Sequence, residues 1–288
     1  MTRDGNTIYI TSEYLNNLKE IGAGTDGIVF NYDKDTLFKI YRKSLFDIKN
    51  DEKIMEAKVK IADLKNIEFK NEDKNFNYYQ NDGEDVIKLR TADAISMAIR
   101  KQKNIKRTEL PKGPIYIDNK FSGCILKKLN GIQIHKLTGL PTKLKHKIIK
   151  SLIIDLEELL KNNVYHTDLE NSPYSIAGYI DGNGESQAIY GHSHVLVDIR
   201  NLKTNIIDLD GKTTVYLERY DEKYEQKTLQ SLCTLLIEFL YKIDTDEVRE
   251  TDEIYFELLK HKINEELAKK IAYKDFSSID EVKKLLKI

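Results

Sequence analysis

A glycine-rich segment with β-prone residues on both sides limits the folds open to this chain. Gly22, Gly24 and Gly27 form a Gly-x-Gly-x-x-Gly pattern. In a dinucleotide-binding βαβ unit these glycines open a helix, but here β-branched and aromatic residues follow Gly27. A Walker-type loop would end in Gly-Lys-Ser or Gly-Lys-Thr, which this segment lacks. The pattern therefore predicts a strand–loop–strand hairpin, either one whose backbone approaches phosphates closely or a flexible hairpin with no ligand.

The strand expected at residues 36–41 carries Lys39 between apolar neighbours. Such a lysine would point across the sheet toward the side that the glycines cover, where it could pair with nucleotide phosphates. The alternative is an edge-strand lysine that points to solvent. Residues 50–66 predict a helix with an apolar face. Glu52 and Glu56 lie one turn apart on this helix, on the same face as each other.

Composition excludes several classes of protein. The chain has 288 residues, of which 40% are hydrophobic and 32% charged, enough for one large domain or two lobes with a core. Its 46 basic and 47 acidic residues give a net charge of -1, which argues against extensive nucleic-acid binding. No apolar run is long enough to span a bilayer. Cys124 and Cys233 have no metal-binding spacing, so a cytoplasmic protein with reduced, buried cysteines is expected.

The clearest helix is predicted over residues 142–162, where Leu and Ile recur at spacings of three and four. Directly after it comes an acidic stretch, residues 164–171, that contains His166 and Asp168. A second acidic turn at 206–211 follows an apolar run and contains Asp208. Two such turns offer a carboxylate base and a metal-binding carboxylate, although each aspartate taken alone could be a turn or cap residue.

The order of these elements resembles that of the protein kinase-like superfamily, over roughly residues 18–240. The resemblance implies a two-lobed α+β fold with a β-rich small lobe and a mostly helical large lobe. The small, nucleotide-binding lobe would cover residues 1–127, and the large, catalytic lobe residues 128–288. The two strands expected within residues 111–127 would lead into the linker between the lobes.

The resemblance also implies site residues and cofactors, with ATP and Mg²⁺ as the expected ligands. Asp168 would be the catalytic base, Lys39 would contact the phosphates, and Glu56, or else Glu52, would hold Lys39. Asp208 would bind the metal. The nucleotide would be bound by the glycine hairpin, by Lys39 and by the linker: Gly22, Gly24, Gly27, Val29, Lys39, Lys127 and Leu129.

The sequence also departs from the kinase pattern. The second metal ligand is usually an asparagine five residues after the catalytic aspartate, where this chain has Pro173. Either Asn171 reaches the metal, or an insertion near 172–193 interrupts the catalytic loop. In the second case the kinase pattern continues at His194, which would then complete the metal site. Thr228 stands where an aspartate usually braces the catalytic loop. His192 and His194 could ligate zinc, but the sequence indicates no third and fourth ligand.

These features predict an ATP/Mg²⁺-dependent phosphotransferase that moves the γ-phosphoryl group to a hydroxyl, expected to be that of a protein Ser or Thr. The alternatives are a small-molecule kinase of the same fold and a pseudokinase that acts as a nucleotide-binding or scaffolding module. The acceptor is unknown, and neither nucleic acid nor membrane is expected as a partner.

Overall fold

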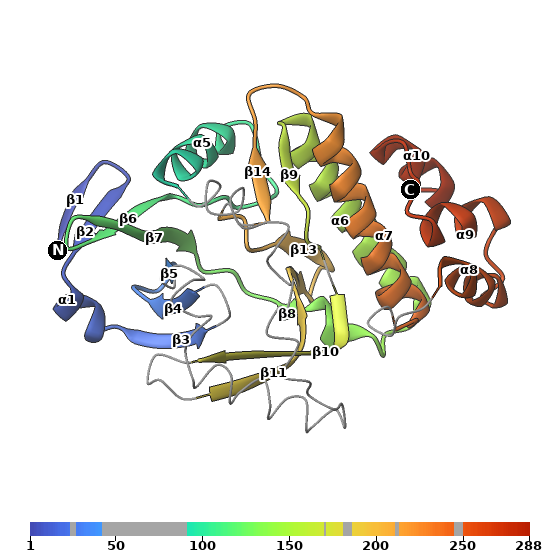
Figure 1. Cartoon of the computed structure of the whole chain (residues 1–288), viewed down its shortest axis with the longest axis horizontal. Coiled ribbons are helices and arrows are strands. Elements are labelled where there is room, and N and C mark those ends of the chain that lie inside the picture. Colours follow the sequence, from blue (N-terminus) through green and yellow to red (C-terminus); the bar gives the residue numbers. More distant parts are fainter. Residues whose placement is uncertain (24–26, 42–90, 170, 181–185, 211–212, 245–249) are drawn as a thin grey trace, which may run out of the picture. The chain divides into compact units, whose positions relative to one another are not determined.

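The computed structural model describes residues 1–288 except 24–26, 42–90, 170, 181–185, 211–212 and 245–249, and it describes no side chain for residues 23 and 171–192 (Figure 1). The helix expected at residues 50–66, with Glu52 and Glu56, lies outside the described residues. The chain forms two compact units. The first contains Met1–Ile99, Leu110–Lys128 and Ile176–Tyr190, and the second contains Arg100–Glu109, Leu129–Ser175 and Gly191–Ile288.

The first unit is built on a seven-stranded sheet in the order β1-β2-β6-β7-β5-β4-β3. All neighbouring strands with a described register are antiparallel except β2 and β6, which run parallel. A short helix, α1 (Ser12–Asn16), joins β2 to β3. The strands are β1 (Thr2–Asp4), β2 (Thr7–Ile10), β3 (Lys19–Ala23), β4 (Gly27–Asn31), β5 (Thr36–Tyr41), β6 (Gly113–Ile117) and β7 (Lys120–Lys127).

The hairpins of this sheet follow from the local sequence. Asp118 and Asn119 join β6 to β7 with φ values of 49° and 66°. Two successive positive φ angles match the twist of paired strands, and Asn and Asp tolerate them best. One face of the sheet buries a cluster of apolar side chains that alternate along the strands: Ile8, Ile10, Phe38, Ile115 and Ile125.

The second unit is mostly helical. It contains the long helices α6 (Thr142–Lys161) and α7 (Glu222–Tyr241) and the shorter α8 (Thr251–Lys260), α9 (Glu265–Ala272) and α10 (Ile279–Leu286). The helix α5 (Ala92–Gln102) and the 3-10 turn η2 (Ile134–Leu137) are also described. No described helix is long and apolar enough to cross a membrane.

Small β elements accompany these helices. A three-stranded sheet has the order β13-β12-β8, and β14 pairs with β9. The insertion expected near 172–193 forms a separate two-stranded sheet, β10 with β11, and its residues Ile176–Tyr190 belong to the first unit. The strands are β8 (Ile132–Gln133), β9 (Val164–His166), β10 (Asn171–Ile180), β11 (Ser186–Ser193), β12 (Val195–Asp198), β13 (Lys203–Ile206) and β14 (Thr214–Tyr216).

The core of the second unit lies along α6 and α7, whose apolar residues recur at helical spacing. Of the Leu and Ile residues that give α6 its helical spacing, Leu144 is half-buried. The others are buried: Ile148, Ile149, Leu152, Ile153, Leu156, Leu159 and Leu160. A polar network ties α6 to β13, because Asp155 accepts hydrogen bonds from Arg107 (2.6 Å) and from the Thr204 hydroxyl. Burial raises the pKa of Asp155 to about 6 despite these partners.

Lys145 joins the start of α6 to the end of α7. Its side chain is 2% exposed, and its ammonium donates to the backbone carbonyl of Phe239 at 2.7 Å. That carbonyl lies in the last turn of α7, where carbonyls lack partners within the helix. Burial, and to a lesser extent Lys242, lowers the pKa of Lys145 from 10.5 to about 8. Lys145 therefore bonds a helix terminus at the cost of burying an ammonium group.

We predict that this burial makes stability pH-dependent. Because the pKa of Lys145 is lower in the folded than in the unfolded chain, its contribution is fully present above about pH 10.5 and is lost as the pH falls through about 8. Denaturant unfolding at pH 7 and pH 10 should therefore show the unfolding free energy of wild type rising relative to that of Lys145→Met as the pH increases.

Lys143→Met is the matched control, because Lys143 is exposed on the same helix turn. Its unfolding free energy should follow that of wild type at both pH values. A difference between wild type and Lys145→Met that stays constant from pH 7 to pH 10 would contradict the prediction.

Candidate functional site

Asp168 lies in a loop held between two strands and a buried helix. The preceding strand β9 leaves the end of α6 through Asn163, whose φ of 54° turns the chain sharply. Thr214 of β14 pairs with His166 of β9. One residue further on, Thr167 donates both its N–H (2.8 Å) and its hydroxyl (3.1 Å) to the Thr213 carbonyl. These bonds fix the backbone immediately before Asp168.

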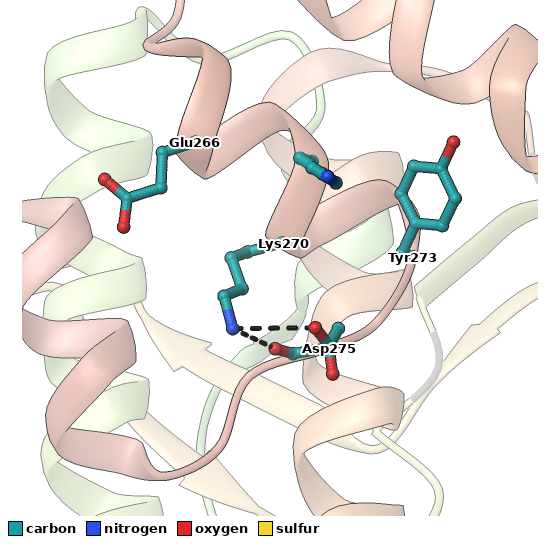
Figure 2. A pocket seen from close by; sticks show the side chains of 5 residues that line it. Glu266, Lys270, Tyr273 and Asp275 are labelled. Carbon is teal, nitrogen blue, oxygen red and sulfur yellow. Dashed lines mark hydrogen bonds and ion pairs between the residues drawn. The ribbon is translucent and has the colours of Figure 1, made fainter.

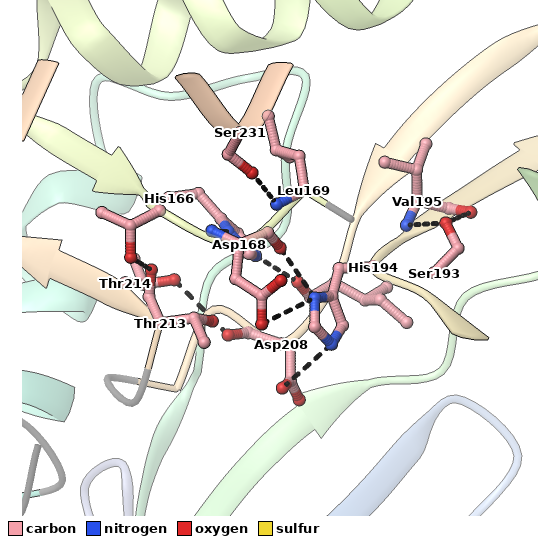
Figure 3. Close-up of polar contacts among 12 residues, drawn as sticks. His166, Asp168, Leu169, Ser193, His194, Val195, Asp208, Thr213, Thr214 and Ser231 are labelled. Carbon is pink, nitrogen blue, oxygen red and sulfur yellow. Dashed lines mark hydrogen bonds and ion pairs between the residues drawn. The ribbon is translucent and has the colours of Figure 1, made fainter. Parts of the chain in front are cut away.

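His166 links the Asp168 loop to the segment that carries Asp208 (Figure 3). The Asp168 N–H donates to His166 Nδ1 at 3.2 Å, so Nε2 carries the proton and donates to the Ile207 carbonyl at 3.0 Å. Burial, together with the nearby His194, lowers the pKa of His166 to about 4. His166 is therefore a neutral structural bridge with both ring nitrogens engaged, as the kinase resemblance implies.

Asp208 follows directly on strand β13. Antiparallel pairing places Val195 of β12 opposite Ile206, and the Ile207 N–H donates to the His194 carbonyl at 2.8 Å. Asp208 itself has a φ of 65°, a left-handed conformation that is uncommon for residues other than glycine but tolerated by Asp. Such conformations are enriched where a side chain must be aimed at a functional site.

His194 lies between the two carboxylates. Its Nδ1 is 2.7 Å from the Asp168 carbonyl and 3.5 Å from Asp168 Oδ2, and its Nε2 is 3.6 Å from Asp208 Oδ2. The three side chains are 27% (Asp168), 21% (Asp208) and 18% (His194) exposed, so solutes can reach them. Burial lowers the pKa of His194, but the carboxylates of Asp168 and Asp208 outweigh it and raise the pKa to about 10.

The loop that carries Asp168 is braced from α7 by a residue that sequence reasoning missed. The buried Leu169 N–H donates to the Ser231 hydroxyl. Thr228, where the kinase pattern has its bracing aspartate, instead donates its hydroxyl to the Tyr224 carbonyl of its own helix at 3.0 Å. The available signal was a serine within the apolar run of α7. The brace thus comes from a position three residues later than the kinase pattern puts it.

We predict that Ser231→Ala destabilises the protein by about 1–3 kcal/mol, because the buried Leu169 N–H is left without its acceptor. Thr228→Val is the matched control. The Tyr224 carbonyl that it releases lies in the first turn of α7 and still accepts the backbone N–H four residues later, so the loss should stay below about 1 kcal/mol. Unfolding free energies from denaturant titration would test this, and equal losses in the two variants would contradict it.

The first unit holds the residues predicted to bind phosphates. Lys39 is buried at 6% exposure on β5, where it pairs with Val29 on one side and Cys124 on the other. A Cβ at Gly27 would come within 2.6 Å of the Ile40 carbonyl oxygen, so the close approach of β4 and β5 requires this glycine. Gly22, opposite Val29, has open space around it. The expected strand–loop–strand hairpin is present.

The remaining predicted residues fall in different places. Lys127 ends β7 and is exposed, and Leu129 lies just beyond it and is half-buried. Gly24 and Glu56 lie outside the described residues, as does the side chain of Asn171. Cys124 and Cys233 are both buried and form no disulfide, as expected. Of the predicted site residues, the structure brings together Asp168 and Asp208, with His194 as the added member.

The side chains of this site suit a cation whose remaining ligands are water and substrate oxygens. Within the described part of the chain, no group of three or more His, Cys, Asp and Glu side chains is arranged to hold a metal alone. Asp168 and Asp208 nevertheless present partly exposed carboxylate side chains. Mg²⁺ is commonly bound by one or two carboxylates, with waters and substrate phosphates completing the shell. The residues present fit such a metal.

A surface pocket of the second unit offers different chemistry (Figure 2). It is lined by Glu266, Lys269, Lys270, Tyr273 and Asp275, around α9. Lys270 donates to the Asp275 carbonyl at 2.7 Å and lies 3.1 Å from a Glu281 carboxylate oxygen. Its charge is thus largely balanced within the fold, and the pocket contains none of the predicted site residues.

Comparison with known proteins identifies the fold. No family model matches the sequence, and no curated protein is similar to it in sequence. The structure is similar to that of the PK-1 kinase of Cydia pomonella granulovirus, with a TM-score of 0.52 and 13% identity over 95% of this chain and 96% of that one. A Legionella pneumophila kinase solved with IP6 bound matches at 18% identity over 81% of this chain and 64% of that one, with a TM-score of 0.35. The granulovirus match confirms a divergent protein kinase-like α+β fold.

Proposed function

We propose that this protein is a phosphotransferase that uses ATP and a divalent metal to phosphorylate a hydroxyl group, that of a protein Ser or Thr. The observation that carries the proposal is the meeting of Asp168 and Asp208 around His194 on a kinase-like fold. The two aspartates are 40 residues apart in the sequence. Turn or cap residues with unrelated roles have no reason to share one partner, whereas phosphoryl transfer requires a base and a metal-binding carboxylate together.

The residues divide the work as follows in this proposal. The acceptor hydroxyl oxygen forms a bond to the γ-phosphorus, the bond between that phosphorus and the bridging oxygen breaks, and ADP leaves. Asp168 takes the hydroxyl proton. Asp208 holds the metal, and Lys39 contacts the phosphates from the β-rich unit, which we propose is the nucleotide-binding lobe. When bound, a divalent cation supplies charge neutralisation on the phosphate oxygens. His166 holds the Asp168 loop and the segment of Asp208 together through its two ring nitrogens.

We predict that Asp168→Asn lowers phosphoryl transfer by about 10²–10⁴-fold, because an amide cannot accept the proton. The measurement is transfer from γ-labelled ATP to a generic Ser/Thr protein substrate and to the chain itself. Asp198→Asn is the control, since among the described residues the Asp198 carboxylate bonds to Arg200 and Asn201 of its own turn. Transfer that persists unchanged in Asp168→Asn would refute the proposed role.

A pseudokinase is the second candidate, and one observation favours it. The carboxylates of Asp168 and Asp208 lie within 3.6 Å of His194 and raise its pKa to about 10, so an imidazolium there would balance charge on both. Pro173 also supplies no side-chain ligand at the usual position. A protein built this way could bind nucleotide as a signal or scaffold and never transfer the phosphoryl group. A small-molecule acceptor remains the alternative within the enzyme class.

Thermal unfolding with ATP separates these functions. If nucleotide binds only the folded chain, ATP at a hundred times its Kd stabilises by about 2.7 kcal/mol, and we expect a clear rise in Tm that grows when a divalent metal is added. A rise with ATP alone, unaffected by metal and without transfer to any acceptor, would identify a pseudokinase. The absence of any rise would exclude both nucleotide-dependent functions.

A further inference from the structure

We propose that His194 is a nitrogen ligand of the divalent cation at this site, together with Asp208. It would replace the asparagine amide that the kinase pattern places after the catalytic aspartate. The inference rests on the proposed function for the identity of the site, but its argument uses only the described contacts of His194 and its neighbours.

The backbone delivers His194 to Asp208. His194 directly precedes β12 and Asp208 follows β13, and the two strands are paired in register from Val195 and Ile206 outward. The Ile207 N–H bond to the His194 carbonyl extends that pairing by one residue. The His194 side chain is therefore fixed beside Asp208 by the sheet, although the insertion β10–β11 separates it from Asp168 in the sequence.

The imidazole is oriented as metal-binding histidines usually are. Nδ1 lies 2.7 Å from the Asp168 carbonyl, which can only accept, so Nδ1 carries a proton. A backbone carbonyl on one ring nitrogen is the usual device that sets the tautomer and aims the other nitrogen at a metal. The other nitrogen, Nε2, is the one that faces Asp208.

The distance between the two candidate ligand atoms fits a shared cation. Nε2 and Asp208 Oδ2 are 3.6 Å apart, beyond the 2.7–3.2 Å range of N–H···O hydrogen bonds. Two ligands each about 2.1 Å from one ion, at angles between 90° and 120°, lie roughly 3.0–3.6 Å apart. The nearby His166 does not compete, because both of its nitrogens are engaged with backbone groups.

A nitrogen ligand changes which metal the site prefers. Mg²⁺ favours an all-oxygen shell, whereas imidazole raises affinity for first-row transition ions. A site with one imidazole and one carboxylate, completed by phosphate oxygens, should therefore favour Mn²⁺ over Mg²⁺. The rival interpretation is that His194 stays an imidazolium that pairs with the carboxylates and repels cations. The two interpretations predict opposite effects of removing the ring.

Mn²⁺ binding to the purified full chain tests the inference without measuring turnover. Free Mn²⁺ would be followed by EPR, with and without a nonhydrolysable ATP analogue, and nitrogen coupling of bound Mn²⁺ by pulsed EPR. We expect an imidazole nitrogen signal in wild type. His194→Ala should lose that signal and weaken Mn²⁺ binding at least about tenfold. His194→Asn should also lose it and shift the preference from Mn²⁺ toward Mg²⁺, because an amide oxygen replaces the nitrogen.

His146→Ala is the matched control. His146 is exposed on α6, and its Nδ1 lies 2.9 Å from a backbone carbonyl, so it shares the backbone contact of His194. It should keep both the nitrogen signal and the Mn²⁺ affinity of wild type. If His194→Ala proves unfolded by circular dichroism, His194→Asn decides the question by the same two measurements.

Unchanged or tighter Mn²⁺ binding in the His194 variants would overturn the inference and favour the imidazolium. Failure of the proposed function looks different. If Mn²⁺ shows nitrogen coupling but the chain transfers no phosphoryl group, His194 is a metal ligand and the proposed phosphotransferase function is wrong. If Mg²⁺ supports phosphoryl transfer equally in wild type and His194→Ala, the phosphotransferase function holds and His194 is not a metal ligand.

Discussion

The hydrogen bond from His166 Nε2 to the Ile207 carbonyl is the contact on which the site depends. It joins the strand before Asp168 to the segment that carries Asp208, and the buried His166 ring limits the competition of water for it. Because burial also lowers the pKa of His166, the ring stays neutral and keeps one donor and one acceptor. The two acidic turns are thereby held as a single unit and not as independent loops.

The helices behind the site supply the rigidity that such a unit needs. Ser231 on the buried helix α7 accepts a hydrogen bond from the Leu169 N–H in the loop of Asp168, and α7 is in turn joined to α6 through Lys145. Both helices bury nearly continuous apolar faces. The exposed carboxylates therefore stand on a closely packed core, which is the arrangement that preorganised active sites require. The departure at Thr228 shows that a different side chain on the same helix can brace the loop.

Much of the fold followed from local pattern. The helix α6, the two strands within residues 111–127 and the glycine hairpin are all present where the sequence predicts them, since each depends on interactions within a few residues. The granulovirus comparison confirms the kinase-like fold implied by their order. Ser231 and His194 were harder to assign, because their partners Leu169, Asp168 and Asp208 are brought near by strand pairing and helix packing across long stretches of chain.

By itself, the sequence determined the residue types available to the site, the strands on both sides of the glycines and the apolar helix before Asp168. These are properties of short segments, set by backbone propensity and by the spacing of apolar side chains. Only the tertiary structure decided which residue occupies the position between Asp168 and Asp208. That choice depends on the register of β12 with β13, which brings His194 from beyond an insertion to the carboxylates, and register is a non-local property.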